Sequence, residues 1–223
     1  MGLDYSIKTY VKKDKISKCL EWFYKNTYQF DKKTFSVLIN NELFEINGDG
    51  VKLNDYQSNY IDKNEDIQEF EKIYFNTSLI FDIDPKIIAS IPGWELDYDM
   101  NRLKDFKEDF ESLYLGNGKI IIGGFDSTIT KLKNSEIYEI ELTAVTSDMS
   151  IMLETSISVK KWILEFSRIS DSILSYLDLE HNGHKIMYYK GKEIEITIRE
   201  GFEEGEENEL SCLLDDYFAF TYK

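Results

Sequence analysis

The sequence predicts an α+β protein with a mainly antiparallel mixed sheet and three or four packed helices. Three observations lead to this prediction. Apolar residues recur with both the helical and the strand period, the elements follow one another without a regular βαβ rhythm, and several strand pairs are separated by short turn sequences. Hydrophobic residues make up 42% of the 223 positions, enough to form a core. We therefore expect a single domain over residues 1–223, with a possible subdivision near 115–118.

The first part of the chain predicts a strand, a helix and a hairpin. Residues 3–11 alternate between apolar and polar sides, as in a strand. Apolar residues at helical spacing predict a helix over residues 15–26, and Asp14 precedes it as the expected N-cap. The runs 35–39 and 43–46 flank an Asn-Asn pair and predict a hairpin.

The next segments predict a strand between more polar stretches. Residues 54–69 are polar and acidic and favour a loop or a surface helix, whereas 72–81 predict a strand. Asp84-Pro85 predicts the start of a short helix, because Asp is a good N-cap and Pro suits the first helical position. A helix is expected over residues 100–114, with Gly116 as its C-terminal cap.

The second half of the chain repeats the mixture of strands and helices. The apolar run 119–125 predicts a short strand, and clean alternation over 136–145 predicts a half-buried one. Helices are expected around 149–154 and over 158–169. The segments 173–179, 185–189 and 193–198 resemble a three-strand meander, although residues 171–179 could instead continue the preceding helix.

The charge of the chain restricts its partners. With 42 acidic against 26 basic residues, the net charge is −16, which argues against nucleic acid and against an anionic membrane surface as ligands. The same charge would attract a basic protein, although many cytosolic proteins are acidic without such a partner. We find no secretory signal and no apolar stretch of membrane-spanning length, so we expect a cytoplasmic protein. Cys19 and Cys212 are expected to be reduced thiols, and the Lys-, Ile- and Asn-rich, Arg-poor composition suggests a bacterial origin.

One cluster has the composition of a metal site. Asp178, Glu180, His181 and His184 bring four potential ligands within seven residues, and they include both histidines of the chain. Zinc binds imidazole nitrogen and carboxylate oxygen, so these residue types suit it. A solvent-exposed polar turn around Asn182-Gly183 would have the same composition, and both interpretations are kept.

Other motifs are weaker. The run 47–50 has the glycines of a calcium loop but lacks its twelfth-position glutamate, so we interpret it as a turn. The run 116–119 lacks the rest of a phosphate-binding loop. Residues 146–150 can cap a helix or bind an anion at its N-terminus. Three aspartates at strand ends could divide acid and base roles, but close pairs are expected by chance in so acidic a chain: Asp82, Asp84 and Asp126.

Two functional hypotheses from different classes follow. The first is a non-catalytic acidic binding protein, comparable with a bacterial immunity-type inhibitor of a basic protein partner. The second is a metal-dependent hydrolase that uses the cluster from Asp178 to His184. No organic cofactor is expected, because no nucleotide or phosphate motif is complete. A structural subunit of a larger assembly is a third possibility, and the oligomeric state is not determined by the sequence.

Overall fold

The computed structural model describes residues 3–28, 33–39, 42–48, 50–54, 57–60, 65–66, 72–91, 112–132 and 136–198. The helices in these ranges are α1 (Ile16–Asn26), α2 (Pro85–Ala89), α4 (Ser147–Thr155) and α5 (Ile157–Ile169). The strands are β1 (Ser6–Lys12), β2 (Thr27–Tyr28), β3 (Thr34–Ile39), β4 (Glu42–Asn47), β5 (Val51–Asn54), β6 (Gln57–Tyr60), β7 (Glu65–Asp66), β8 (Lys72–Asp82), β9 (Tyr114–Gly116), β10 (Lys119–Lys131), β11 (Ile137–Thr143), β12 (Leu174–Asp178), β13 (His184–Tyr189) and β14 (Lys192–Ile198).

These strands confirm the predicted α+β class. The main sheet has the order β14-β13-β12-β1-β11-β10-β8-β5-β6, and neighbouring strands are antiparallel. The first strand of the chain lies inside this sheet, between β11 and β12. A smaller sheet of β4, β3 and β7 contains a parallel pair between β3 and β7. Sequence neighbours such as β12, β13 and β14 pair through short turns, which explains the antiparallel arrangement.

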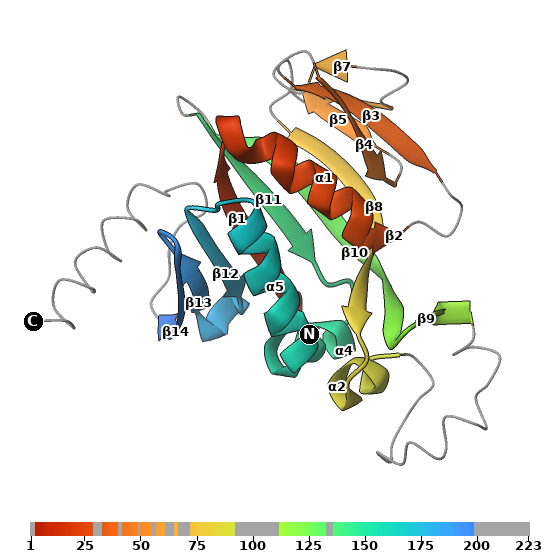
Figure 1. Ribbon diagram of the computed structural model, residues 1–223, viewed down its shortest axis with the longest axis vertical. Helices are drawn as coiled ribbons and strands as arrows, with labels where there is room; N and C mark the ends of the chain where they lie inside the picture. The colour runs from red at the N-terminus through yellow and green to blue at the C-terminus, as the bar shows by residue number, and fades with distance from the viewer. Residues whose placement is uncertain are drawn as a thin grey trace, which may run out of the picture.

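Helices α1 and α5 lie against one face of the main sheet and enclose the principal core (Figure 1). Trp22 of α1 packs against Trp162 and Phe166 of α5, with ring centroids 5.0 and 5.2 Å apart. Phe75 of β8 meets Phe23 of α1 edge to face. Large aromatic rings therefore join the two helices to the sheet. No helix in the described ranges is both long and apolar enough to cross a membrane.

The hairpin of β3 and β4 confirms the predicted pairing and adds to the same core. The backbone at the end of β4 is closely packed: a Cβ on Gly48, where φ is +138°, would lie 2.6 Å from the carbonyl oxygen of Asn76. The side-chain amide of Asn47 donates to the carbonyl oxygens of Tyr24 and Thr27. Residues 47 and 48 therefore connect the hairpin to α1, β2 and β8. The predicted turn over 47–50 includes Asp49, which lies outside the described residues, so it stays a prediction.

Helix α1 confirms the predicted helix, but the predicted cap is wrong. Residues 13–15 form a short 3-10 turn, and the N-cap position is Lys15 without a side-chain hydrogen bond. The Asp14 carboxylate instead lies 3.7 Å from the Lys15 ammonium. Because this 3-10 turn precedes α1, the helix begins at Ile16 and Asp14 does not occupy the N-cap position.

The interpretation of residues 54–69 as loop or surface helix is wrong where the structure describes them. Gln57–Tyr60 is strand β6, and Glu65–Asp66 is strand β7. β6 pairs with β5, which extends the main sheet through its pairing with β8. Polar sequences are common on edge strands, because one side remains without a strand partner.

The predicted helix over residues 100–114 lies mostly outside the described residues. Ser112 and Leu113 are helical, but Tyr114–Gly116 is strand β9. Gly116 pairs with Lys119 across Asn117 and Gly118, whose φ values are +52° and +73°. Asn and Gly tolerate positive φ, as both central residues of such a two-residue hairpin require. Gly116 is therefore a strand residue at the start of a hairpin, and not the expected helix cap.

The second half largely follows the predictions. Strand β10 continues beyond residue 125 to Lys131, past a register shift between Ile122 and Phe125. Helices α4 and α5 begin at the N-caps Thr146 and Ser156. The meander of β12, β13 and β14 is confirmed, and residues 174–178 are strand and not helix. Ile169, in the last turn of α5, is 40% exposed.

Candidate functional site

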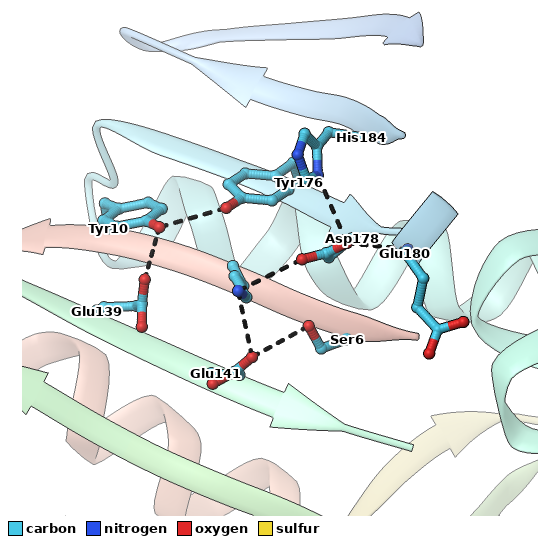
Figure 2. A network of polar contacts seen from close by, with 9 residues as sticks. Ser6, Tyr10, Glu139, Glu141, Tyr176, Asp178, Glu180 and His184 are labelled. Atoms are coloured by element: carbon cyan, nitrogen blue, oxygen red, sulfur yellow. Dashed lines mark hydrogen bonds and ion pairs between the residues drawn. The ribbon is translucent and has the colours of Figure 1, made fainter. Parts of the chain in front are cut away.

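The main sheet carries a network of polar side chains on the face opposite α1 and α5. Along β1, Ile7 and Val11 enter the core under the helices, so alternation places Ser6, Lys8 and Tyr10 on the other face. The register brings partners from both neighbouring strands beside them. Figure 2 shows the resulting network, which joins Ser6, Lys8, Tyr10, Glu139, Glu141, Tyr176, Asp178, Glu180 and His184.

Lys8 is the centre of this network. It is only 4% exposed, and its ammonium lies 3.4 Å from a carboxylate oxygen of Glu141 on β11 and 3.4 Å from one of Asp178 on β12. Burial by itself would lower the pKa of Lys8, but the surrounding acidic groups, with Glu141 the largest contributor, outweigh it and raise that pKa. Lys8 is therefore a permanently charged buried cation that bridges three strands.

Two tyrosines and a carboxylate continue the network along β1. The Tyr10 hydroxyl donates to Glu139 at 2.6 Å and lies 3.3 Å from the Tyr176 hydroxyl. Since the Tyr10 proton is used on Glu139, Tyr176 donates to the Tyr10 oxygen. Burial raises the pKa of Tyr10 above its usual range and that of Tyr176 to about 12. Burial also raises the pKa of Glu139, against the opposing effect of the Tyr10 hydrogen bond.

His184 closes the other end of the network. Its Nδ1 lies 3.6 Å from an Asp178 oxygen, and its ring meets Tyr176 edge to face with centroids 5.1 Å apart. Burial lowers the pKa of His184, and the attraction of Asp178 only partly opposes this shift. His184 is therefore neutral near pH 7, and its aromatic contact and position on β13 hold it in the sheet.

The four residues of the predicted metal site do not converge on one point, and they have different neighbours. Asp178 faces Lys8 and His184, while Glu180 accepts a hydrogen bond from the Asp4 amide at 3.2 Å. His181 is exposed in the 3-10 turn that follows β12. Within the described ranges, no group of three or more His, Cys, Asp or Glu side chains is placed to hold a metal ion. Asp178 and His184 are neighbours, and metal binding at these four residues stays a prediction.

The other candidate carboxylates have structural partners. Asp82 pairs with Lys119 at 2.6 Å and Lys161 at 2.7 Å, and these lysines lower the pKa of its carboxyl. Asp84 caps α2, and Asp126 accepts a hydrogen bond from Asn76 at 3.2 Å. Nothing in these contacts pairs two carboxylates for acid and base roles.

The polar run 146–150 is used in capping and anchoring. The Thr146 hydroxyl accepts from the Met149 amide, as the capping interpretation predicted. The hydroxyls of Ser147 and Ser150 accept from the amides of Leu3 and Tyr5, each at 3.0 Å. These contacts tie α4 to the residues that precede β1.

The central residues of the network were not singled out from the sequence. Alternation did place Lys8 and Tyr10 on one side of the first strand, and Glu139 and Glu141 on one side of another. That pattern is the only signal the sequence contains for them, and it is also the pattern of an ordinary solvated sheet face. The missing information was that β1 lies between β11 and β12.

The chemistry of these side chains favours a structural role in the sheet over a catalytic one. The raised pKa keeps Lys8 protonated, so it is not a free amine nucleophile. Both tyrosines are neutral hydrogen-bonding groups at physiological pH. The network therefore links four strands, β1, β11, β12 and β13, through charged and polar contacts.

No known protein family, curated protein or solved structure matches this chain. Its class is consequently defined by its own architecture: an α+β protein with a mostly antiparallel sheet, two helices on one face and a buried polar network on the other.

Proposed function

We propose that this chain is a non-catalytic acidic binding protein that inhibits a basic protein partner, in the manner of bacterial immunity proteins. The observation that carries the proposal is its net charge of −16, from 42 acidic and 26 basic residues. Such a charge accelerates encounter with a basic protein and disfavours acidic competitors.

The polar network supports a role without catalysis. Its lysine stays charged and lies between two carboxylates, and its histidine and tyrosines are buried in the sheet. A catalytic group must reach the atoms on which it acts, and these side chains are largely covered. The network is consistent with a rigid platform that presents a binding surface elsewhere.

The proposal is tested by capture at low salt. Tagged, folded protein is incubated with native lysate of the source organism, and bound proteins are eluted with increasing NaCl and identified by mass spectrometry. We expect one basic protein at stoichiometric amount, released as salt screens the attraction. Its purified form should bind with an association rate that falls steeply between 20 and 200 mM salt, roughly tenfold or more. Recovery of no basic protein by a folded bait would contradict the proposal.

The alternative hypothesis is a metal-dependent hydrolase, and the proximity of Asp178 and His184 is the observation in its favour. Zinc would be expected at stoichiometric amount in purified protein, and it would be lost in His184→Ala. Elemental analysis and a zinc titration followed by calorimetry measure this directly. A metal-free protein that takes up no zinc would eliminate the hydrolase.

A further inference from the structure

The outer face of α4 exposes apolar groups at one end of the molecule. Ile151 is 46% exposed, and Ile157, at the first position of α5, is 79% exposed. Together with Asp148, Glu154 and Thr155, they form what we call the α4 surface. Figure 1 shows that α4 and the start of α5 lie beside α2 at this end. Exposed apolar patches with a polar rim are typical of protein interaction sites.

A hollow beside Ile157 gives this surface a shape that an apolar side chain can enter. Its volume is about 210 Å³, and its lining includes the buried side chains of Leu153, Leu177 and Met187. Four charged side chains also line it: Glu154, Lys160, Lys185 and Glu195. Lys160 and Lys185 both pair with Glu195. The hollow therefore combines three buried apolar side chains with lysines that already pair with Glu195, and Glu154 is the lining carboxylate without an ion pair in the described residues.

The charge of the α4 surface is negative. Asp148 and Glu154 lie three residues before and after Ile151, so the helical repeat places them on the same face. Helix α4 has no basic residue, and within the described part of the chain no ion pair involves either carboxylate. The nearby lysines of α5 are already paired, Lys160 with Glu195 and Lys161 with Asp82.

The α4 surface rests on a well-anchored helix. The inward hydroxyls of Ser147 and Ser150 bond the backbone of residues 3 and 5, and the N-cap of α5 bonds Asp84 at 2.6 Å. A surface held in this way loses little conformational entropy when it binds. Rigid elements of this kind are suitable supports for an interface.

We propose that the α4 surface docks the basic partner, which places an apolar side chain in the hollow beside Ile157 and lysine or arginine side chains against Asp148 and Glu154. Charge complementarity selects this occupant, because the carboxylates around Ile151 have no cation of their own in the described residues. The inference rests on the proposed function and assigns it a surface.

The first test uses a photo-crosslinking side chain, p-benzoylphenylalanine, placed at position 151 in the full-length protein. Leu43 of β4, which is 51% exposed, provides the matched control position. After incubation with lysate and irradiation, we expect a covalent product with a basic protein from position 151 and none from position 43. Crosslinks from position 43 alone would overturn the assignment of the surface.

The second test measures affinity for the crosslinked protein after its purification. Ile151→Glu and Ile157→Glu should each weaken binding at least tenfold, whereas Leu43→Glu should change it less than twofold. The double variant Asp148→Lys, Glu154→Lys should slow association at low salt at least tenfold. Circular dichroism and urea unfolding establish that each exposed-site variant is folded.

The outcomes separate the two proposals. If wild-type protein binds a basic partner and Ile151→Glu binds it equally well, the surface is wrong and the proposed function stands. If wild-type protein captures no basic partner, both are overturned.

Discussion

Lys8 illustrates how a single residue can depend on its surroundings. A buried ammonium is unfavourable unless anions and hydrogen bonds replace its lost water. Here Glu141 and Asp178 supply that compensation from two different strands, and their side chains are each 20% exposed. Removing one of these three charged side chains should therefore lower the stability of the protein, because the remaining charges stay partly desolvated without their partner.

Replacing Lys8 with alanine should lower the free energy of unfolding by about 3 kcal/mol, the lower part of the range for a broken buried ion pair. The loss leaves two nearby carboxylates without their cation. Urea denaturation at pH 7 measures it. Lys12→Ala, an exposed position on the same strand, is the control and should change stability by less than about 0.5 kcal/mol. Equal effects at both positions would contradict the role of the network.

Tyr10 allows a second test at the scale of one hydroxyl. Tyr10→Phe removes the donor to Glu139 and should cost about 1–3 kcal/mol, because a buried acceptor with a charge loses its hydrogen bond. Tyr176→Phe removes a contact between two neutral hydroxyls and should cost less, about 1 kcal/mol. Chemical denaturation of both variants gives the comparison. A larger loss in Tyr176→Phe would contradict this order.

At the scale of elements, Asp84 joins two helices with one carboxylate. One oxygen accepts from the amides of Lys86 and Ile87 in α2, at 2.8 and 3.0 Å. The other accepts from the Ser156 hydroxyl and the Ser158 amide of α5, at 2.6 and 3.0 Å. Burial tends to raise the pKa of Asp84, but these hydrogen bonds outweigh it and lower that pKa.

Asp84→Ala should therefore destabilise the protein more than the loss of a single cap. We expect about 2–3 kcal/mol, compared with about 1 kcal/mol for Thr146→Ala, which caps α4 alone. Thermal and urea unfolding at pH 7 provide the measurement. Similar losses in the two variants would indicate that Asp84 serves only one helix.

The same carboxylate predicts a pH dependence. Because the folded-state pKa of Asp84 is lower than its unfolded value of about 3.9, the unfolded chain binds the proton first as pH falls. Its stabilisation is fully present above the unfolded pKa and is lost as pH decreases through the folded pKa. The stability of wild type should therefore fall more steeply than that of Asp84→Asn below about pH 4.5. Parallel curves for the two proteins would rule out this contribution.

At the scale of the whole molecule, burial of the aromatic core stabilises the fold and charge repulsion destabilises it. The aromatic residues of α1, α5 and β8 form a continuous core under one face of the sheet. The net charge of −16 acts against compactness, because like charges repel more strongly in the folded chain.

Salt should consequently stabilise the isolated protein. Raising NaCl from 10 to 150 mM screens the repulsion and should increase stability by roughly 1 kcal/mol, or about 2–4 °C in Tm for a chain of this size. Differential scanning calorimetry measures this, with sucrose added to a low-salt sample to separate preferential exclusion from screening. A Tm that falls with salt would show that attractive ion pairs dominate.

The sequence by itself determined the type of the strongly periodic elements. Apolar spacing was sufficient for α1 and α5, and alternation was sufficient for β1 and β11, because these patterns reflect which face each element buries. Asp84-Pro85 likewise identified a helix start through local chemistry. Tertiary pairing overrode the local signal in the strand β6, and a 3-10 turn moved the helix start away from Asp14.

Only the tertiary structure decided the site. Lys8 meets Glu141 and Asp178 because β1 is inserted between two strands from the second half of the chain. Alternation names the face of each strand, but it contains no information about which strands are neighbours, since many strand orders satisfy the same pattern. The burial of each network residue depends on that strand order, and its pKa depends on its burial. The sequence around Lys8 therefore did not indicate that this lysine is the centre of a buried network.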